Sequence, residues 1–328
     1  MTRSTRFVRR AAGPIGAIAL AAAIAWQLDL GAITAHLAGM APGWFAAAIA
    51  LLLASNVVSA LRWVRIARGL GLVLGERTAL RLYFQAAVLN TALPGAVVGG
   101  DLWRAAGAHR AGNPRAASAL SVFADRAGGL WVLCVIGCVC LAIAAASGQL
   151  HGAPTAAFVT AVALAAGALL PVWPGVRRLG AALPDRPLAR RVSHLTGALG
   201  DAQQQMRATA GWSLLVQALS IGALQCAAAA VGVALPWPVA GAVAAGVFVA
   251  ASLPVSVGGF GTREAAAAGL FPLAAASHEA GVAAGVAYGL AQIVQSIGAF
   301  ALAPPGDPSS VRKASAPDCA PDSDPRPR

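Results

Sequence analysis

The chain is poor in charged residues. Asp, Glu, Lys and Arg make up 11% of its 328 residues, whereas a soluble domain has about 25%. Hydrophobic residues account for 58% of the chain, and the mean hydropathy is +0.70. This composition excludes a soluble globular protein and predicts an integral membrane protein. We expect its spanning segments to be helices, because a helix satisfies its own backbone hydrogen bonds in lipid.

Several chemical motifs are missing as well. Neither Gly-Lys-Ser nor Gly-Lys-Thr occurs, which excludes the phosphate-binding loop of an intrinsic ATPase. The five cysteines include three in one apolar run, Cys134, Cys138 and Cys140, and their spacing matches neither a zinc site nor a disulfide framework. The five histidines stand apart from one another. We therefore expect no metal and no cofactor, and no catalytic residue can be picked out.

Nine hydrophobic segments follow one another along the chain. They are Pro14–Leu28, Trp44–Leu61, Leu82–Val98, Ala119–Ala146, Ala156–Trp173, Trp212–Val233, Val239–Leu253, Ala265–Ala276 and Val282–Ala303. A full span takes about 20 residues, so the third, seventh and eighth segments are short. We predict six full spans with short or re-entrant pieces, in an all-α polytopic membrane helix bundle. The basic start also fits a cleaved signal peptide, but the many later spans favour an uncleaved first helix.

Basic residues are confined to alternate loops. Arginines precede the first span, follow the second and fill Arg177–Arg207, whereas Asp29–Pro42, Ser147–Pro154 and Ala234–Pro238 contain no Lys or Arg. This positive-inside pattern places the amino terminus in the cytoplasm. The net charge of +12 therefore faces anionic lipid headgroups, and we expect membrane lipids, not nucleic acid, as partners.

A short phrase occurs twice, about half the chain apart. Leu93–Arg104 and Leu253–Glu264 both begin with Leu-Pro, continue through a Gly-Gly pair and reach an Arg. Proline and paired glycines break helices, and backbone freed in this way is tolerated in a membrane only where protein or a water-filled cavity covers it. Two broken helices at matching positions, such as an inverted repeat produces, indicate the midplane substrate site of a transporter.

The first broken segment has two interpretations. Basic loops flank Leu82–Val98 on both sides, so a complete span would carry Arg104, Arg110 and Arg115 outside, against the general pattern. We favour a re-entrant segment that enters from the cytoplasm, breaks near Pro94 and returns.

Ionisable side chains occur at membrane depth, where each costs about 2.5–3.5 kcal/mol to insert and often marks function. Asp125 and Arg126 lie inside the span that starts near Ala119. They are either functional or an interfacial pair whose arginine reaches the headgroups. The charged residues of the repeated phrase are either functional or neutralise one another and lock the re-entrant loops; they are Asp101, Arg104, Arg263 and Glu264.

Polar residues also recur at helical spacing on several spans, and each such stripe can serve helix–helix hydrogen bonding. Together they predict a bundle with a polar interior. The stripes are Ser55, Ser59 and Arg62; Tyr288, Gln292 and Gln295; Gln217 and Ser220; and Gln85 and Asn90.

These residues resemble one family of bacterial and archaeal membrane proteins, the lysylphosphatidylglycerol synthase transmembrane (flippase-like) family. The resemblance covers about residues 10–303. It rests on Ser59–Trp63, Asn90–Gly95 with Gly99, Gly100, Asp101 and Arg104, Asp125 and Arg126 with Gly128, and Pro254–Glu264. Full-length synthases of this family join a lipid-flipping membrane part to a soluble domain that transfers lysine from lysyl-tRNA to phosphatidylglycerol. This chain lacks such a domain, so the resemblance implies the translocation part, or a stand-alone relative, in the bacterial cytoplasmic membrane.

We therefore expect a transmembrane domain over residues 1–303 that moves phospholipids or lipid-linked intermediates, and a disordered cytoplasmic tail over 304–328. The alternatives are a membrane-embedded headgroup transferase and a lipid-binding subunit of an envelope-assembly complex, with a glycosyltransferase or lipid-modifying enzyme as partner. The arginines would neutralise a lipid phosphate, the carboxylates would hold the arginines or contact a cationic headgroup, and the glycines would let backbone approach. The expected substrate-binding residues are Arg62, Asn90, Pro94, Gly99, Gly100, Asp101, Arg104, Asp125, Arg126, Pro254, Gly258, Gly259, Arg263 and Glu264.

Overall fold

The computed structural model describes residues 30–92, 96–151, 197, 200–252 and 261–301. Within these ranges the chain is all-α and contains no strand, as the composition predicts. The predicted first span, the predicted span Ala156–Trp173 and the predicted tail lie outside the described residues, as do Pro94, Pro254, Gly258 and Gly259.

Within the described ranges, four helices are long and apolar enough to cross a membrane. They are α3 (Pro42–Gly69), α6 (Arg115–Ala146), α10 (Ala210–Ala230) and α13 (His278–Ala301). Each corresponds to one of the six predicted full spans, so the prediction is confirmed for the four that the structure describes. A shorter helix, α2 (Leu30–Ala38), precedes α3, and residues 200–208 are helical just before α10.

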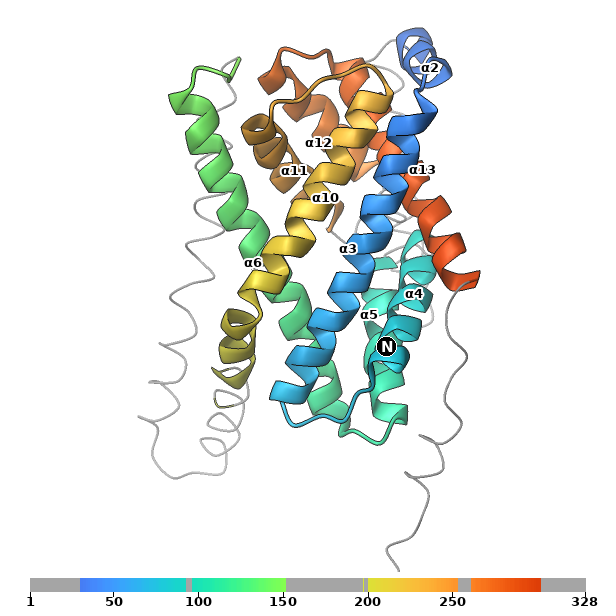
Figure 1. Ribbon diagram of the computed structural model, residues 1–328, viewed down its shortest axis with the longest axis vertical. Coiled ribbons are helices and arrows are strands. Elements are labelled where there is room, and N and C mark those ends of the chain that lie inside the picture. Colours follow the sequence, from blue (N-terminus) through green and yellow to red (C-terminus); the bar gives the residue numbers. More distant parts are fainter. Residues whose placement is uncertain (1–29, 93–95, 152–196, 198–199, 253–260, 302–328) are drawn as a thin grey trace, which may run out of the picture.

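The first broken segment forms a helical hairpin. Helix α4 (Glu76–Ala92) and helix α5 (Ala96–Arg110) pack side by side, and their connection contains Pro94. Both outer ends of this pair lie at the same end of the bundle, where α3 finishes and α6 begins (Figure 1). The predicted entry and return at one end of the bundle is therefore confirmed, although α4 begins six residues before the predicted Leu82. Entry from the cytoplasm stays a prediction.

The second broken segment forms another hairpin, made of α11 (Trp237–Ala251) and α12 (Thr262–Leu270), which also pack against each other. A short 3₁₀ helix, η1 (Phe271–Ala274), follows α12 and leads to α13. This second hairpin enters the bundle from the end opposite to the first (Figure 1). The two hairpins therefore point toward each other from opposite ends.

The order of elements shows an inverted repeat. In both halves a long helix is followed by a hairpin and a second long helix, and α3 runs opposite to α10 while α6 runs opposite to α13 (Figure 1). The packing is reciprocal, because α4 lies against α13 as α11 lies against α6. The first long helix of each half also ends next to a glycine with positive φ, Gly71 at 74° and Gly232 at 84°, a conformation that glycine adopts without strain.

Small residues hold the bundle together. Alanines with no exposed surface line the contacts of α10, α11 and α13, among them Ala227, Ala244 and Ala284. Between α4 and α5 the close contact depends on Gly100, where a β-carbon would lie 2.7 Å from the carbonyl oxygen of Ala86. Close backbone approach of this kind is how helices associate where lipid removes the hydrophobic driving force.

Candidate functional site

A cavity of about 560 Å³ lies in the middle of the bundle, between the two hairpins. We call it the central cavity. Its wall takes residues from α3, α6, α10 and α13 and from both hairpins: Tyr83 and Asp101 come from the first, Phe248 and Ser252 from the second. Described residues of both predicted broken segments therefore line the same cavity. The volume is in the range of ordinary small-molecule sites.

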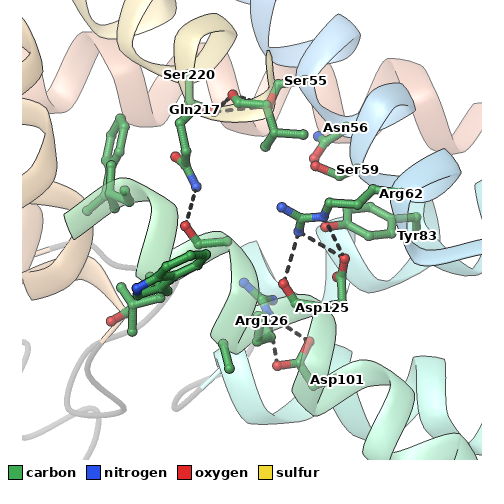
Figure 2. Close-up of a pocket in the computed structure, with 18 of the residues that line it drawn as sticks. Ser55, Asn56, Ser59, Arg62, Tyr83, Asp101, Asp125, Arg126, Gln217 and Ser220 are labelled. Atoms are coloured by element: carbon green, nitrogen blue, oxygen red, sulfur yellow. Dashed lines mark hydrogen bonds and ion pairs between the residues drawn. The ribbon is translucent and has the colours of Figure 1, made fainter. Parts of the chain in front are cut away.

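Asp125 is the centre of a buried ion network on one side of this cavity (Figure 2). Its carboxylate has no exposed surface and accepts hydrogen bonds from Arg62 Nε at 2.9 Å and from Arg104 Nη2 at 2.7 Å. Arg62 also donates to the backbone oxygen of Asp125 at 3.1 Å and to the hydroxyl of Ser213 at 3.1 Å. The network thus ties α3, α5, α6 and α10 together.

Aromatic rings hold the guanidinium of Arg104. Its central carbon lies 4.4 Å from the ring centroid of Trp63 and 4.3 Å from that of Tyr83. Cation–π contacts of this kind stabilise a buried arginine while leaving its N–H groups free for other partners. The indole of Trp63 is itself fixed, because its Nε1 donates to the hydroxyl of Ser121 at 3.2 Å.

Arg126 points in another direction from its neighbour Asp125 (Figure 2). Its Nε lies 2.9 Å from both carboxylate oxygens of Asp101, and its side chain is 42% exposed at the cavity wall. Asp101 also lies 3.6 Å from Arg104, as part of the same cluster. The cluster contains three guanidinium groups and two carboxylates, counting Arg62 and Asp125, so it carries one excess positive charge.

The second hairpin contributes a more local ion pair. Arg263 donates from Nε and Nη2 to one carboxylate oxygen of Glu264, at 3.0 and 2.7 Å. The other carboxylate oxygen of Glu264 accepts the backbone N–H of Gly261 and so caps α12. Neither Arg263 nor Glu264 lines the central cavity. Arg263 reaches it through Gln292, whose side-chain oxygen accepts a hydrogen bond at 3.2 Å.

Three of the four predicted polar stripes line the cavity. Ser55 and Ser220 share a hydrogen bond of 2.9 Å across α3 and α10, and Gln217 donates to the backbone oxygen of Gly129 on α6 at 2.9 Å (Figure 2). The cavity wall also includes the other residues of the stripes on α3 and α13, which are Ser59, Arg62, Tyr288, Gln292 and Gln295. Gln85 is an exception, because it accepts a hydrogen bond from Trp103 Nε1 instead. The bundle therefore has a polar interior.

Two of the predicted site residues have packing roles in the structure. The backbone N–H of Gly100 donates to the side-chain oxygen of Asn90 on α4 at 3.1 Å, so this N–H group is not free to bind a ligand. Asn90 and Arg104 line a second, smaller cavity next to the central one, and Gly99 lies in α5 beside them.

Sequence patterns did not single out Tyr83, which lines the central cavity beside Arg104. It is one of the chain's two tyrosines; the other, Tyr288, belongs to a predicted polar stripe and also lines the cavity. The scarcity of tyrosine is the sequence feature that could have drawn attention to Tyr83. Gln203 and Arg207, from the helical residues before α10, complete the wall, and no motif marks them.

The described wall of the central cavity carries three guanidinium groups and two carboxylates. All of them except Arg207 belong to the ion network around Asp125, and the other polar groups are mainly amides and hydroxyls. Among the described residues, no group of three His, Cys, Asp or Glu side chains could hold a metal ion.

One comparison with known proteins identifies the family of the chain. The family model described as the lysylphosphatidylglycerol synthase TM region matches residues 12–299. A search of curated proteins and a search of solved structures each gave no match. The family match spans both hairpins, the ion network around Asp125 and all four long helices. The chain therefore belongs to the lysylphosphatidylglycerol synthase transmembrane family, and it is a multi-pass membrane protein of the kind related to lipid handling.

Proposed function

We propose that this protein moves an anionic phospholipid, or a lipid-linked intermediate with an anionic headgroup, across the cytoplasmic membrane. One observation carries the proposal: a cavity large enough for a headgroup lies between two hairpins that enter the bundle from opposite ends. An arrangement of inverted broken helices around a central site supports alternating access, because each half can in turn cover the site from its own side.

The charge of the cavity favours an anion. The ion network around Asp125 carries one excess positive charge, and Arg207 on the same wall adds another. Arg207 has no carboxylate partner within the part of the chain that the structure describes. Arginine suits phosphate because its planar guanidinium donates two parallel hydrogen bonds to phosphate oxygens. Arg126, with 42% of its side chain exposed, is the network member best placed to make this contact.

The remaining wall of the cavity is apolar and fits lipid chains. Leu52, Phe123, Leu130 and Phe248 all line it. An amphiphile could therefore place its charged group against the arginines and its hydrocarbon against these side chains. A soluble anion would leave the apolar wall without a partner, so the combination favours a lipid substrate.

Reconstitution in liposomes tests the proposal. Purified protein is placed in vesicles that contain a fluorescent phosphatidylglycerol, and a membrane-impermeant quencher reports how fast the outer leaflet is replenished. We expect faster exchange than in protein-free vesicles. Replacing Arg126 with Gln removes a charge-assisted contact and should slow exchange about tenfold. No acceleration by the unaltered protein, with any anionic phospholipid tried, would contradict the proposal.

A matched control is available on the surface. Arg68 also pairs with a carboxylate, Glu76, at 3.5 Å, but its side chain is 52% exposed and lies away from the cavity. The Arg68→Gln variant should exchange lipid as fast as the unaltered protein. Equal slowing by Arg68→Gln and Arg126→Gln would mean that loss of net charge, not contact in the cavity, limits the rate.

A further inference from the structure

The smaller cavity beside the central one has unusual chemistry. It has a volume of about 120 Å³ and lies between α3, α4, α5, α6 and α13. We call it the side chamber. Its wall includes Arg104 and Arg126, and none of the described residues that line it is a carboxylate. The two arginines pair with carboxylates outside this wall, Asp125 and Asp101, in the network that carries one excess positive charge.

Two buried polar groups of the chamber wall have no hydrogen-bond partner among the described residues. They are the Nε and Nη1 atoms of Arg104, a residue 1% exposed, and the hydroxyl of Ser296, also 1% exposed. Nη1 lies 3.6 Å from Asp101, which is beyond hydrogen-bond distance. Buried polar groups are nearly always satisfied, and both of these unpaired groups belong to residues that line one small cavity, so the geometry leaves room for a ligand that supplies the missing acceptor.

Other groups on the wall add donors. The side-chain oxygen of Asn90 already accepts from Gly100, which leaves its NH₂ group for a ligand. The phenol of Tyr83 also lines the chamber. Arginine, amide and hydroxyl donors converging on one small space, with no anionic neighbour on the wall, match an oxyanion with several acceptor oxygens.

The size of the chamber agrees with this assignment. A cavity needs roughly 10–15 Å³ of such volume to hold one water molecule, so the chamber of about 120 Å³ has room for several waters or for one tetrahedral oxyanion. The chamber adjoins the central cavity, because Asn56, Tyr83, Arg126 and Gln292 line both. A molecule with its apolar part in the central cavity can therefore extend a phosphate into the chamber.

We propose that the side chamber is a phosphate-group subsite, in which Arg104, Asn90 and Ser296 donate to the phosphate oxygens. The inference deepens the proposed lipid translocation and rests on it for the source of the phosphate, while the chemistry is shared by a lipid headgroup and by free inorganic phosphate.

Binding to the purified protein in non-ionic detergent tests the subsite. The probes are inorganic phosphate, a short-chain phosphatidylglycerol and a short-chain diacylglycerol, which lacks the phosphate. Binding is followed through tryptophan fluorescence, because Trp63 stacks on Arg104. We expect phosphatidylglycerol to bind more tightly than diacylglycerol, and the Ser296→Ala variant to weaken phosphatidylglycerol about tenfold while leaving diacylglycerol unchanged.

The control variant is Ser118→Ala. Ser118 is also buried with an unpartnered hydroxyl, but it does not line the chamber. It should bind every probe as the unaltered protein does. Weakening of phosphatidylglycerol by Ser296→Ala, without weakening by Ser118→Ala, supports the subsite. Equal effects of the two variants, or equal loss of phosphatidylglycerol and diacylglycerol, would overturn it.

The binding measurements with inorganic phosphate show whether the phosphate group in the chamber comes from a lipid headgroup or from free phosphate. Competition between phosphate and phosphatidylglycerol, both weakened by Ser296→Ala, supports one subsite that accepts either. Phosphatidylglycerol binding with no phosphate binding supports the lipid headgroup as the source. Phosphate binding that Ser296→Ala weakens, in a protein that moves no lipid in vesicles, supports the subsite and contradicts the proposed translocation. Unchanged binding by Ser296→Ala in a protein that does move lipid contradicts the subsite alone.

Discussion

Replacing Asp125 with Asn tests whether the buried ion network holds the first half of the bundle together. The carboxylate has no exposed surface and neutralises two guanidinium groups, from Arg62 and Arg104. Asparagine keeps the shape but turns one acceptor oxygen into an NH₂ donor, which then faces another donor. The excess charge of the network rises from +1 to +2, since one of its two carboxylates is lost.

The expected cost follows from this geometry. Losing one hydrogen bond to a charged group costs about 1.5–3 kcal/mol, and removing one partner of a buried ion pair costs about 3–5 kcal/mol in all. We therefore expect Asp125→Asn to lower the free energy of unfolding by about 3–5 kcal/mol. The matched control is Glu76→Gln, whose pair with Arg68 is more than half exposed and should contribute less than about 1 kcal/mol.

Both variants can be compared as fluorescent-protein fusions in detergent, by the fraction that remains monodisperse in size-exclusion chromatography after heating. Combining Asp125→Asn with Arg62→Gln returns the network to its original excess charge, so the double variant should recover part of the lost stability. If Asp125→Asn melts at the same temperature as Glu76→Gln, the network does not stabilise the bundle and the reasoning from burial is wrong.

Two further predictions concern packing and topology. Gly100→Ala should lower the free energy of unfolding by about 1–3 kcal/mol, because its β-carbon would meet the carbonyl oxygen of Ala86. Gly43→Ala is the control and should leave the free energy of unfolding unchanged, because no atom lies within 4 Å of the added carbon. Equal melting temperatures of the two variants would contradict the packing role of Gly100. In a cysteine-free background, Val73→Cys should react with a thiol reagent from the cytoplasmic side and Ser147→Cys from the opposite side, because only the loop at Val73 is flanked by arginines; labelling of both from one side would refute the topology.

The sequence predicted the fold well where the signal was local. The four described spans follow from their hydropathy, and the break between α4 and α5 follows from the Leu-Pro and Gly-Gly phrase. The polar face of α3 was also predictable, because Ser55, Ser59 and Arg62 recur at helical spacing and all three line the cavity. The start of α4 could not be predicted in this way, because Arg77 and Arg81 lower the hydropathy of its first two turns.

Pairing between helices was harder to predict. Asp125 and Arg126 are adjacent in sequence and suggested a pair, yet neighbours on a helix point about 100° apart. Asp125 therefore pairs with Arg62 and Arg104, while Arg126 pairs with Asp101. Which helix faces which is decided by the packing of the whole bundle, and no local pattern carries that information.

The two halves of the repeat differ in how their ion pairs are anchored, and this gives the molecule a mechanical asymmetry. In the first half, Arg104 of α5 pairs with Asp125 of α6, and Asp101 of α5 with Arg126 of α6, so any sliding of the first hairpin past α6 must separate opposite charges. In the second half, Arg263 pairs with Glu264, the next residue of its own helix, and contacts α13 through a neutral hydrogen bond to Gln292 and through the ring of Tyr288. The ion pairs of the first hairpin therefore cross to the neighbouring long helix, whereas the Arg263–Glu264 pair lies within α12 and moves with it.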